Sequence, residues 1–212
     1  EIGYSHVEGC NSKAYGYYSH AEGYGAVARQ NSAHAEGNNT QANGSYSHSE
    51  GSSTMANNYC SHAEGNGSKA YGSYSHVEGN NCIAGTENSG GGDSSHAEGY
   101  ETVALASYCH TEGNRTKAKN SQAHAEGYGT RANGYCSHAE GYETVAQGYV
   151  SSAHGYCVHA NCNYQTSVGS YNKEYFDSNS ISEYNGSWVE YERGDLVKLQ
   201  NDNNAYRCIV NK

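Results

Sequence analysis

Small and long side chains alternate along this chain in a pattern that repeats every seven residues. Two heptads make a 14-residue unit, as in Ser137-His-Ala-Glu-Gly-Tyr-Glu followed by Thr144-Val-Ala-Gln-Gly-Tyr-Val. Positions one and three of a heptad are small, and positions two and four are long or polar. The pattern runs in frame from Ser5 to about Tyr171. Alternation with a period of two is typical of β-strands, whose successive side chains point to opposite faces.

This alternation predicts an all-β fold, a parallel β-solenoid in which every two heptads form one coil. Small residues at positions one and three would line a narrow interior. The fifth position, often Gly, would turn the chain because Gly adopts positive φ freely. Coils stacked about 4.8 Å apart would pair their backbone groups with those of neighbouring coils. A helix is disfavoured, because Gly recurs every seven residues and the chain has no 3.6-residue apolar stripe.

Composition alone would point to disorder. Leu, Ile, Val and Phe together number 19 of 212 residues and the net charge is −10, which is typical of chains that cannot build a core. A solenoid lined with small residues needs no such core, and the 22 Tyr are unusual for a disordered chain. The 12 Lys and Arg are dispersed, so we expect no nucleic-acid binding. No run of 18 apolar residues is present, so we expect no membrane insertion.

Histidine recurs once in each unit, and each of these histidines is followed two residues later by Glu and then by Gly. Consecutive histidines are two heptads apart, except that His76 and His96 are farther apart, and we assign the difference to a loop insertion at residues 89–94. The His–Glu pairs form a candidate ladder: His6, Glu8, His20, Glu22, His34, Glu36, His48, Glu50, His62, Glu64, His76, Glu78, His96, Glu98, His110, Glu112, His124, Glu126, His138 and Glu140.

A uniform outer face suggests a repeated partner, and a symmetric oligomer would supply one. We therefore expect the ladder to lie at a trimer interface, where hydrogen bonds from His relieve repulsion among stacked carboxylates. One alternative is a solvated face preserved by repeat duplication, and another is a ladder of metal sites. Catalysis is not expected, because ten identical copies argue against a unique active site and Ser and His alternate between faces.

These Ser-His-Ala-Glu-Gly repeats resemble the heptapeptide haemagglutinin repeat in the heads of trimeric autotransporter adhesins, and they are similar to repeats of phage tail-fibre and appendage proteins. The resemblance covers about 165 of the 212 residues. It implies a left-handed parallel β-roll assembled as a parallel homotrimer. Corner tyrosines such as Tyr18, Tyr46, Tyr128 and Tyr142 would pack to close the grooves of the trimer or stack on sugars.

The repeat decays after Val158, so residues 1–171 are expected to form the roll and residues 172–212 a separate C-terminal module or cap. Alternating large residues from Ser187 to Leu199 and from Ala205 to Val210 predict a small antiparallel β-sheet. This stretch weakly resembles chitin-binding-type carbohydrate modules, which implies a candidate glycan-binding platform of Trp188, Tyr191 and Tyr206. The alternative is that these aromatic residues form the core of the cap.

The sequence contains no obvious cofactor or metal motif. Its eight cysteines do not follow the spacing of zinc sites, and we expect free, partly buried thiols. Because the chain starts at Glu1 rather than Met, a processed product or a fragment is expected. We expect a structural attachment fibre at a virion surface or outside the cell, projecting an end that binds a host glycan or protein receptor. The alternatives are the head of a cell-surface trimeric adhesin and a subunit of an extracellular filament.

Overall fold

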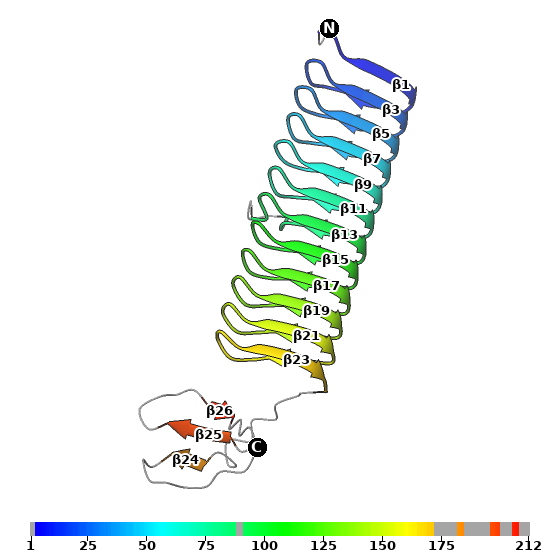
Figure 1. Cartoon of the computed structure of the whole chain (residues 1–212). Coiled ribbons are helices and arrows are strands. Elements are labelled where there is room, and N and C mark those ends of the chain that lie inside the picture. Colours follow the sequence, from blue (N-terminus) through cyan, green and yellow to red (C-terminus); the bar gives the residue numbers. More distant parts are fainter. Residues whose placement is uncertain (1–2, 88–90, 172–181, 185–195, 200–204, 208–212) are drawn as a thin grey trace. The chain divides into compact units, whose positions relative to one another are not determined.

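The computed structural model describes residues 3–87, 91–171, 182–184, 196–199 and 205–207. The chain divides into two units, Glu1–Asn172 and Lys173–Lys212. The first unit is a parallel β-solenoid of about 12 coils, and Figure 1 shows its longer strands stacked from β1 to β23. The coil of two heptads predicted by the sequence is therefore confirmed.

Each regular coil contributes one five-residue strand and one two-residue strand, and these belong to two separate parallel sheets. The first sheet has its strands in the order β1 (His6–Cys10), β3 (His20–Tyr24), β5 (His34–Asn38), β7 (His48–Ser52), β9 (His62–Asn66), β11 (His76–Asn80), β13 (His96–Tyr100), β15 (His110–Asn114), β17 (His124–Tyr128), β19 (His138–Tyr142), β21 (Ser152–Tyr156) and β23 (Thr166–Ser170).

The second sheet follows the same principle with shorter strands. Its order is β2 (Lys13–Ala14), β4 (Val27–Ala28), β6 (Gln41–Ala42), β8 (Met55–Ala56), β10 (Lys69–Ala70), β12 (Ile83–Ala84), β14 (Val103–Ala104), β16 (Lys117–Ala118), β18 (Arg131–Ala132), β20 (Val145–Ala146) and β22 (His159–Ala160). Neighbouring strands are in register by one repeat, so that His20 lies beside His34 and Glu22 beside Glu36. Identical positions therefore form straight columns along the stack.

The interior is built from columns of small residues, as predicted. Ala21 and Ala28 are fully buried in one coil, and Ala125 and Ala132 are fully buried in another. Serine before the histidine satisfies its own hydroxyl by donating to a carbonyl three residues earlier, as Ser47 Oγ does to Gly44 O at 2.7 Å. Small residues thus fill the narrow space without leaving these hydroxyls unpaired.

Glycine at the fifth position of the first heptad has positive φ throughout the regular coils. Gly113 has a φ of +106°, and a Cβ at this position would lie 2.3 Å from the carbonyl oxygen of Gly127 in the next coil. No side chain fits between two backbones at that distance. The column consists of Gly because both its conformation and its stacking contact require it.

In the second heptad the fifth position begins the predicted corner, as Ser19 N bonds to Gly16 O at 3.3 Å, but it does so without positive φ. There the left-handed residue is position seven, which is Tyr18, Tyr46 or Val150 in different coils. Its amide bonds to the preceding coil, as Tyr46 N does to Asn31 O at 2.9 Å. That hydrogen bond holds the corner in a conformation that a non-glycine residue adopts only under constraint.

The insertion begins earlier than the alignment of repeats suggests. Gly85 N bonds to Ala104 O at 2.7 Å, as in a regular coil, and regular corner contacts resume where Ser94 N bonds to Ser73 O at 2.9 Å. Gly92 stacks on Gly72. The additional residues therefore lie between Gly85 and Gly92 rather than at 89–94. Sequence could not separate these placements, because Ser and Gly recur throughout the segment.

The second unit contains three short strands among the residues that the structure describes. They are β24 (Ser182–Tyr184), β25 (Leu196–Leu199) and β26 (Ala205–Arg207). β25 pairs antiparallel with β26, whereas β24 pairs parallel to β25. Trp188 and Tyr191 lie outside the described residues, and Tyr206 is placed only as a residue of β26, so the aromatic platform stays a prediction.

Candidate functional site

The predicted His and Glu residues lie on the outer face of the first sheet, where they form two parallel columns. Each pair is two residues apart in one strand, which places both side chains on the same face. The serine before each histidine points the other way: Ser47 is buried in the interior, whereas His48 is half-buried on the outside. Ser and His of one coil therefore lie on opposite faces, as expected.

The imidazoles form a continuous stack. Ring centroids of neighbouring coils are 4.7–5.0 Å apart from His6 to His138, which is close to the spacing of the strands that carry them. The rings of His62 and His76 are nearly parallel, with 1° between their planes. Each ring from His20 to His138 thus lies between two neighbouring rings, which shield it. The sequence predicted the column but not this mutual shielding.

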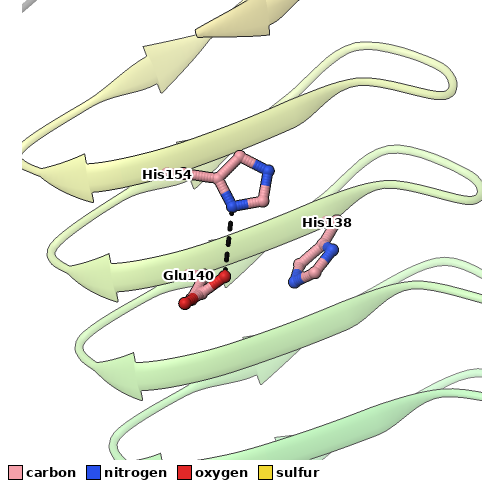
Figure 2. A group of neighbouring side chains, drawn as sticks. All are labelled: His138, Glu140 and His154. Carbon is pink, nitrogen blue, oxygen red and sulfur yellow. Dashed lines mark hydrogen bonds and ion pairs between the residues drawn. The ribbon is translucent and has the colours of Figure 1, made fainter. Parts of the chain in front are cut away.

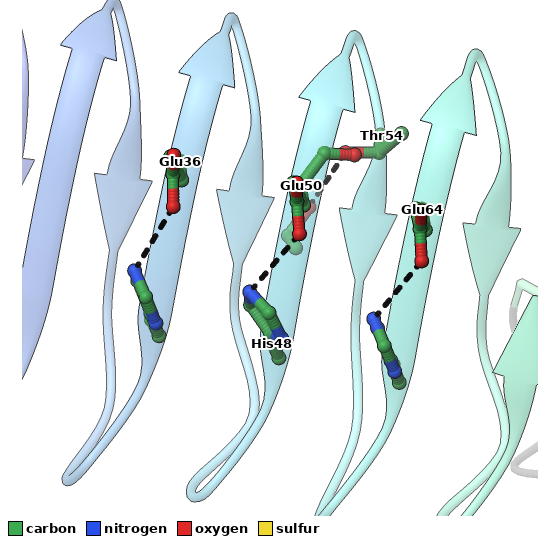
Figure 3. Close-up of polar contacts among 8 residues, drawn as sticks. Glu36, His48, Glu50, Thr54 and Glu64 are labelled. Carbon is green, nitrogen blue, oxygen red and sulfur yellow. Dashed lines mark hydrogen bonds and ion pairs between the residues drawn. The ribbon is translucent and has the colours of Figure 1, made fainter.

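In seven of the described coils, the ladder glutamate contacts the histidine of its own strand. The Nε2–Oε2 distance is 3.4 Å for His20–Glu22 and 3.9 Å for His48–Glu50, and Figure 3 shows the second contact in the row of strands. The remaining pairs of this kind are His6–Glu8, His34–Glu36, His62–Glu64, His96–Glu98 and His124–Glu126. His and Glu therefore meet within one chain.

The glutamates are the more accessible half of the ladder. The Glu50 side chain is 48% exposed, compared with 36% for His48. Nε2 of His48 is shielded from solvent and makes no hydrogen bond within the described part of the chain. A second molecule approaching this face would meet carboxylate oxygens before imidazole nitrogens.

Burial makes the stacked histidines difficult to protonate. The pKa of His62 is lowered to about 4, chiefly by loss of solvation and also by the neighbouring His48 and His76, against a smaller opposing effect of Glu78. The same cause, aided by adjacent histidines, lowers the pKa of His34 and of His96. These imidazoles are therefore neutral at pH 7, and the outer face carries the negative charge of its glutamates.

Comparison with protein-family models and with curated proteins finds no match for this chain. The assignment of a function therefore rests on the geometry of the solenoid and on the resemblance of its repeats.

Acidification is expected to destabilise the solenoid between about pH 6.5 and pH 4. An unfolded histidine binds its proton near pH 6.5, whereas the pKa of folded His62 is about 4. The folded state binds fewer protons in this range, so stability is fully present above about pH 6.5 and falls as the pH decreases. After allowance for solvent screening of half-exposed rings, we expect the unfolding temperature at pH 5 to be about 10 °C below that at pH 7.5.

Circular dichroism melts in the two buffers measure this difference. A variant carrying His34→Gln, His62→Gln and His96→Gln should have a flatter pH profile, because three of the groups with lowered pKa are removed. An unchanged profile in that variant would show that the acid sensitivity comes from other groups.

The outer face of the second sheet is variable, and several of its polar side chains bond to one another. Asn43 Nδ2 donates to Asn57 Oδ1 at 3.1 Å, and Arg29 Nε donates to Asn43 Oδ1 at 2.8 Å. Asn133 and Gln147 repeat the arrangement at 2.9 Å. These amide contacts join one coil to the next, and they explain how a variable polar face contributes to the stack.

Corner tyrosines also stack between coils. The ring centroids of Tyr128 and Tyr142 are 4.9 Å apart, and those of Tyr142 and Tyr156 are 4.8 Å apart. Such offset stacking is favourable for aromatic rings and covers part of each ring. Tyr142 nevertheless keeps 38% of its surface exposed. These contacts lie within one chain, so closure of the trimer grooves and sugar binding by the tyrosines both stay predictions.

The remaining sequence-based predictions concern thiols, membrane spans and metal ligands. Cys82 and Cys109 are free thiols buried inside the coils, at positions taken in most other coils by Ser, Thr or Ala. Within the described residues, no helix has the length and apolar character needed to cross a membrane. A group of three potential metal ligands, His138, Glu140 and His154, lies at the end of the ladder. The repeat pattern alone did not single out this group.

Proposed function

We propose that the chain is the shaft of a trimeric attachment fibre, in which a left-handed solenoid stiffens and projects an end that binds a receptor. It does no chemistry itself, and it acts at a virion surface or outside the cell. The observation that carries this proposal is the contrast between the two outer faces. The first sheet repeats His and Glu through ten coils, whereas the second sheet varies at the equivalent positions.

A uniform face is advantageous where every coil meets the same partner. In a parallel homotrimer with its axis along the stack, each coil meets the corresponding coil of the other two chains. Half-exposed glutamates then lie near the symmetry axis, where donors from neighbouring chains relieve their repulsion. The histidines need not supply these donors across the interface, because the described His–Glu contacts are already made within one chain.

The oligomeric state of the full chain tests this proposal. One chain has a mass of 22.7 kDa, and sedimentation equilibrium at pH 7.5 should give three times that mass. The double change Glu50→Lys with Glu64→Lys should reduce the mass to that of a monomer, because it places cations on the proposed interface. Its matched control, Gln41→Lys with Met55→Lys, alters the other sheet in the same region of the stack and should remain trimeric. A monomeric parent, or dissociation by the control alone, would refute the trimeric shaft.

The receptor-binding end is proposed from the sequence of residues 172–212. A glycan-array screen of the full chain, with Trp188→Ala and Tyr206→Ala as variants, tests whether this module binds sugars. Binding that both variants abolish supports the platform, and absence of binding leaves a protein receptor as the proposed partner. The second candidate function is the head of a cell-surface trimeric adhesin, favoured by the resemblance of the repeat to that family.

A further inference from the structure

The regular pattern of the ladder changes at its last coils. In the glutamate column, Glu126 and Glu140 are followed by His154, which occupies the position of a glutamate in the next strand. In the histidine column, His138 is followed by Ser152. One coil therefore presents an imidazole directly beside a carboxylate of its neighbour, where every preceding coil presents a second carboxylate.

This exchange brings three donor groups together. Nδ1 of His154 lies 3.2 Å from Oε2 of Glu140, as the dashed line in Figure 2 shows. The rings of His138 and His154 have centroids 4.9 Å apart and planes at 70° to each other. One ligand atom from each of the three residues lies within 4.8 Å of the other two. In the described part of the chain, no other such group of three occurs.

We propose that His138, Glu140 and His154 form a binding site for a divalent transition-metal ion of the zinc class. Two imidazole nitrogens and one carboxylate oxygen are the donor set that such ions accept, and a water molecule completes four-coordination. Calcium and magnesium prefer oxygen ligands and are not expected to bind here.

The surroundings of the three residues suit a metal ion. All three side chains come from adjacent strands β19 and β21, whose backbones are fixed by the ladder of hydrogen bonds. The side chain of Glu140 is 53% exposed and that of His154 is 31% exposed, so an ion can reach them. Small side-chain rotations would bring the donors from their present separations to Zn–N and Zn–O distances of about 2 Å.

Such an ion would join two consecutive coils where the uniform His–Glu column ends. It does not depend on the number of chains in the assembly, since all three ligands belong to one chain. The site shares His138 and Glu140 with the proposed trimer interface, but it needs ligands from one chain only, so a monomeric protein should still bind the ion.

Titration calorimetry of the full chain, purified without a histidine tag, tests the site with Zn²⁺ at pH 7.5. We expect one Zn²⁺ per chain above any weak background from the other histidines. The variant His154→Glu restores the residue that the preceding coils carry, so it should fold and stack normally. This variant lacks one direct ligand, so its affinity for Zn²⁺ should be lower by at least about 10- to 100-fold. That is the loss usually caused by removing a residue that only supports a ligand.

A gain-of-site variant provides the reverse test. Glu112→His recreates the arrangement at another level of the stack, beside His96 and Glu98. It should raise the stoichiometry from one to two Zn²⁺ per chain, with all cysteines unchanged. Equal Zn²⁺ binding by the parent and His154→Glu would overturn the proposal, and so would the absence of a binding step in the parent. A stoichiometry unchanged by Glu112→His would also count against it.

Discussion

Replacing Gly113 with alanine adds a single methyl group, and we expect it to destabilise the solenoid more than most single substitutions would. The added Cβ would lie 2.3 Å from Gly127 O, and the residue would keep a φ of +106°. Relief requires two coils to separate, which weakens hydrogen bonds on both sides of the substitution. Conformational strain and lost stacking together should lower the free energy of unfolding by about 4 kcal/mol. That corresponds to a melting temperature about 8–16 °C lower.

Gly169 provides the matched control for this substitution. It belongs to the same column and has a similar φ of +120°, but nothing lies within 4 Å of its would-be Cβ. Gly169→Ala should therefore retain only the conformational penalty, about 1–3 kcal/mol. Thermal melts of the two variants separate stacking from strain. Equal losses would mean that close approach of the coils does not require the glycine column.

Enlarging the interior is expected to have the second large effect. Ala132 is fully buried, and its column contains alanine in every coil of the second sheet. Ala132→Leu adds three carbon atoms to a space bounded by two backbones, so the strands must move apart. We expect the free energy of unfolding to fall by about 3 kcal/mol, at the upper end of the usual range for overpacking.

The adjacent Arg131 supplies the comparison for this variant. Its side chain is exposed on the opposite face of the same strand, so Arg131→Leu introduces the same residue without filling the interior. Denaturant unfolding should place Arg131→Leu within about 0.5 kcal/mol of the parent. If the two leucines were equally tolerated, the interior would be wider or more plastic than a close-packed solenoid allows.

The sequence was sufficient to predict the coil length and the two faces of each strand. Period two inside the heptad separates Ala125 from His124 and Glu126, and the structure places them inside and outside as expected. These features follow directly from strand geometry, so a single sequence reveals them. The pairing of His with Glu on one face is a consequence of the same rule.

Other features depend on contacts between coils and were not predictable in the same way. Position seven is left-handed in both heptads, and its residues include Tyr, Ser, Cys and Val in the second heptad and Asn and Gly in the first. Asn11, Gly25 and Asn39 offered a signal, since Asn and Gly favour this conformation. The lowered pKa of His62 arises from burial among stacked neighbours, and the position of the insertion follows from the hydrogen bonds of Gly85.

The register of the coils makes the solenoid a molecular ruler. Every coil repeats the contacts of the previous one, and the extra residues between Gly85 and Gly92 leave the strands on both sides in register. Removing or duplicating one whole unit of two heptads should therefore change the length by about 4.8 Å without altering the remaining coils. The number of copies of the unit therefore sets the length of the solenoid, in equal steps of one coil.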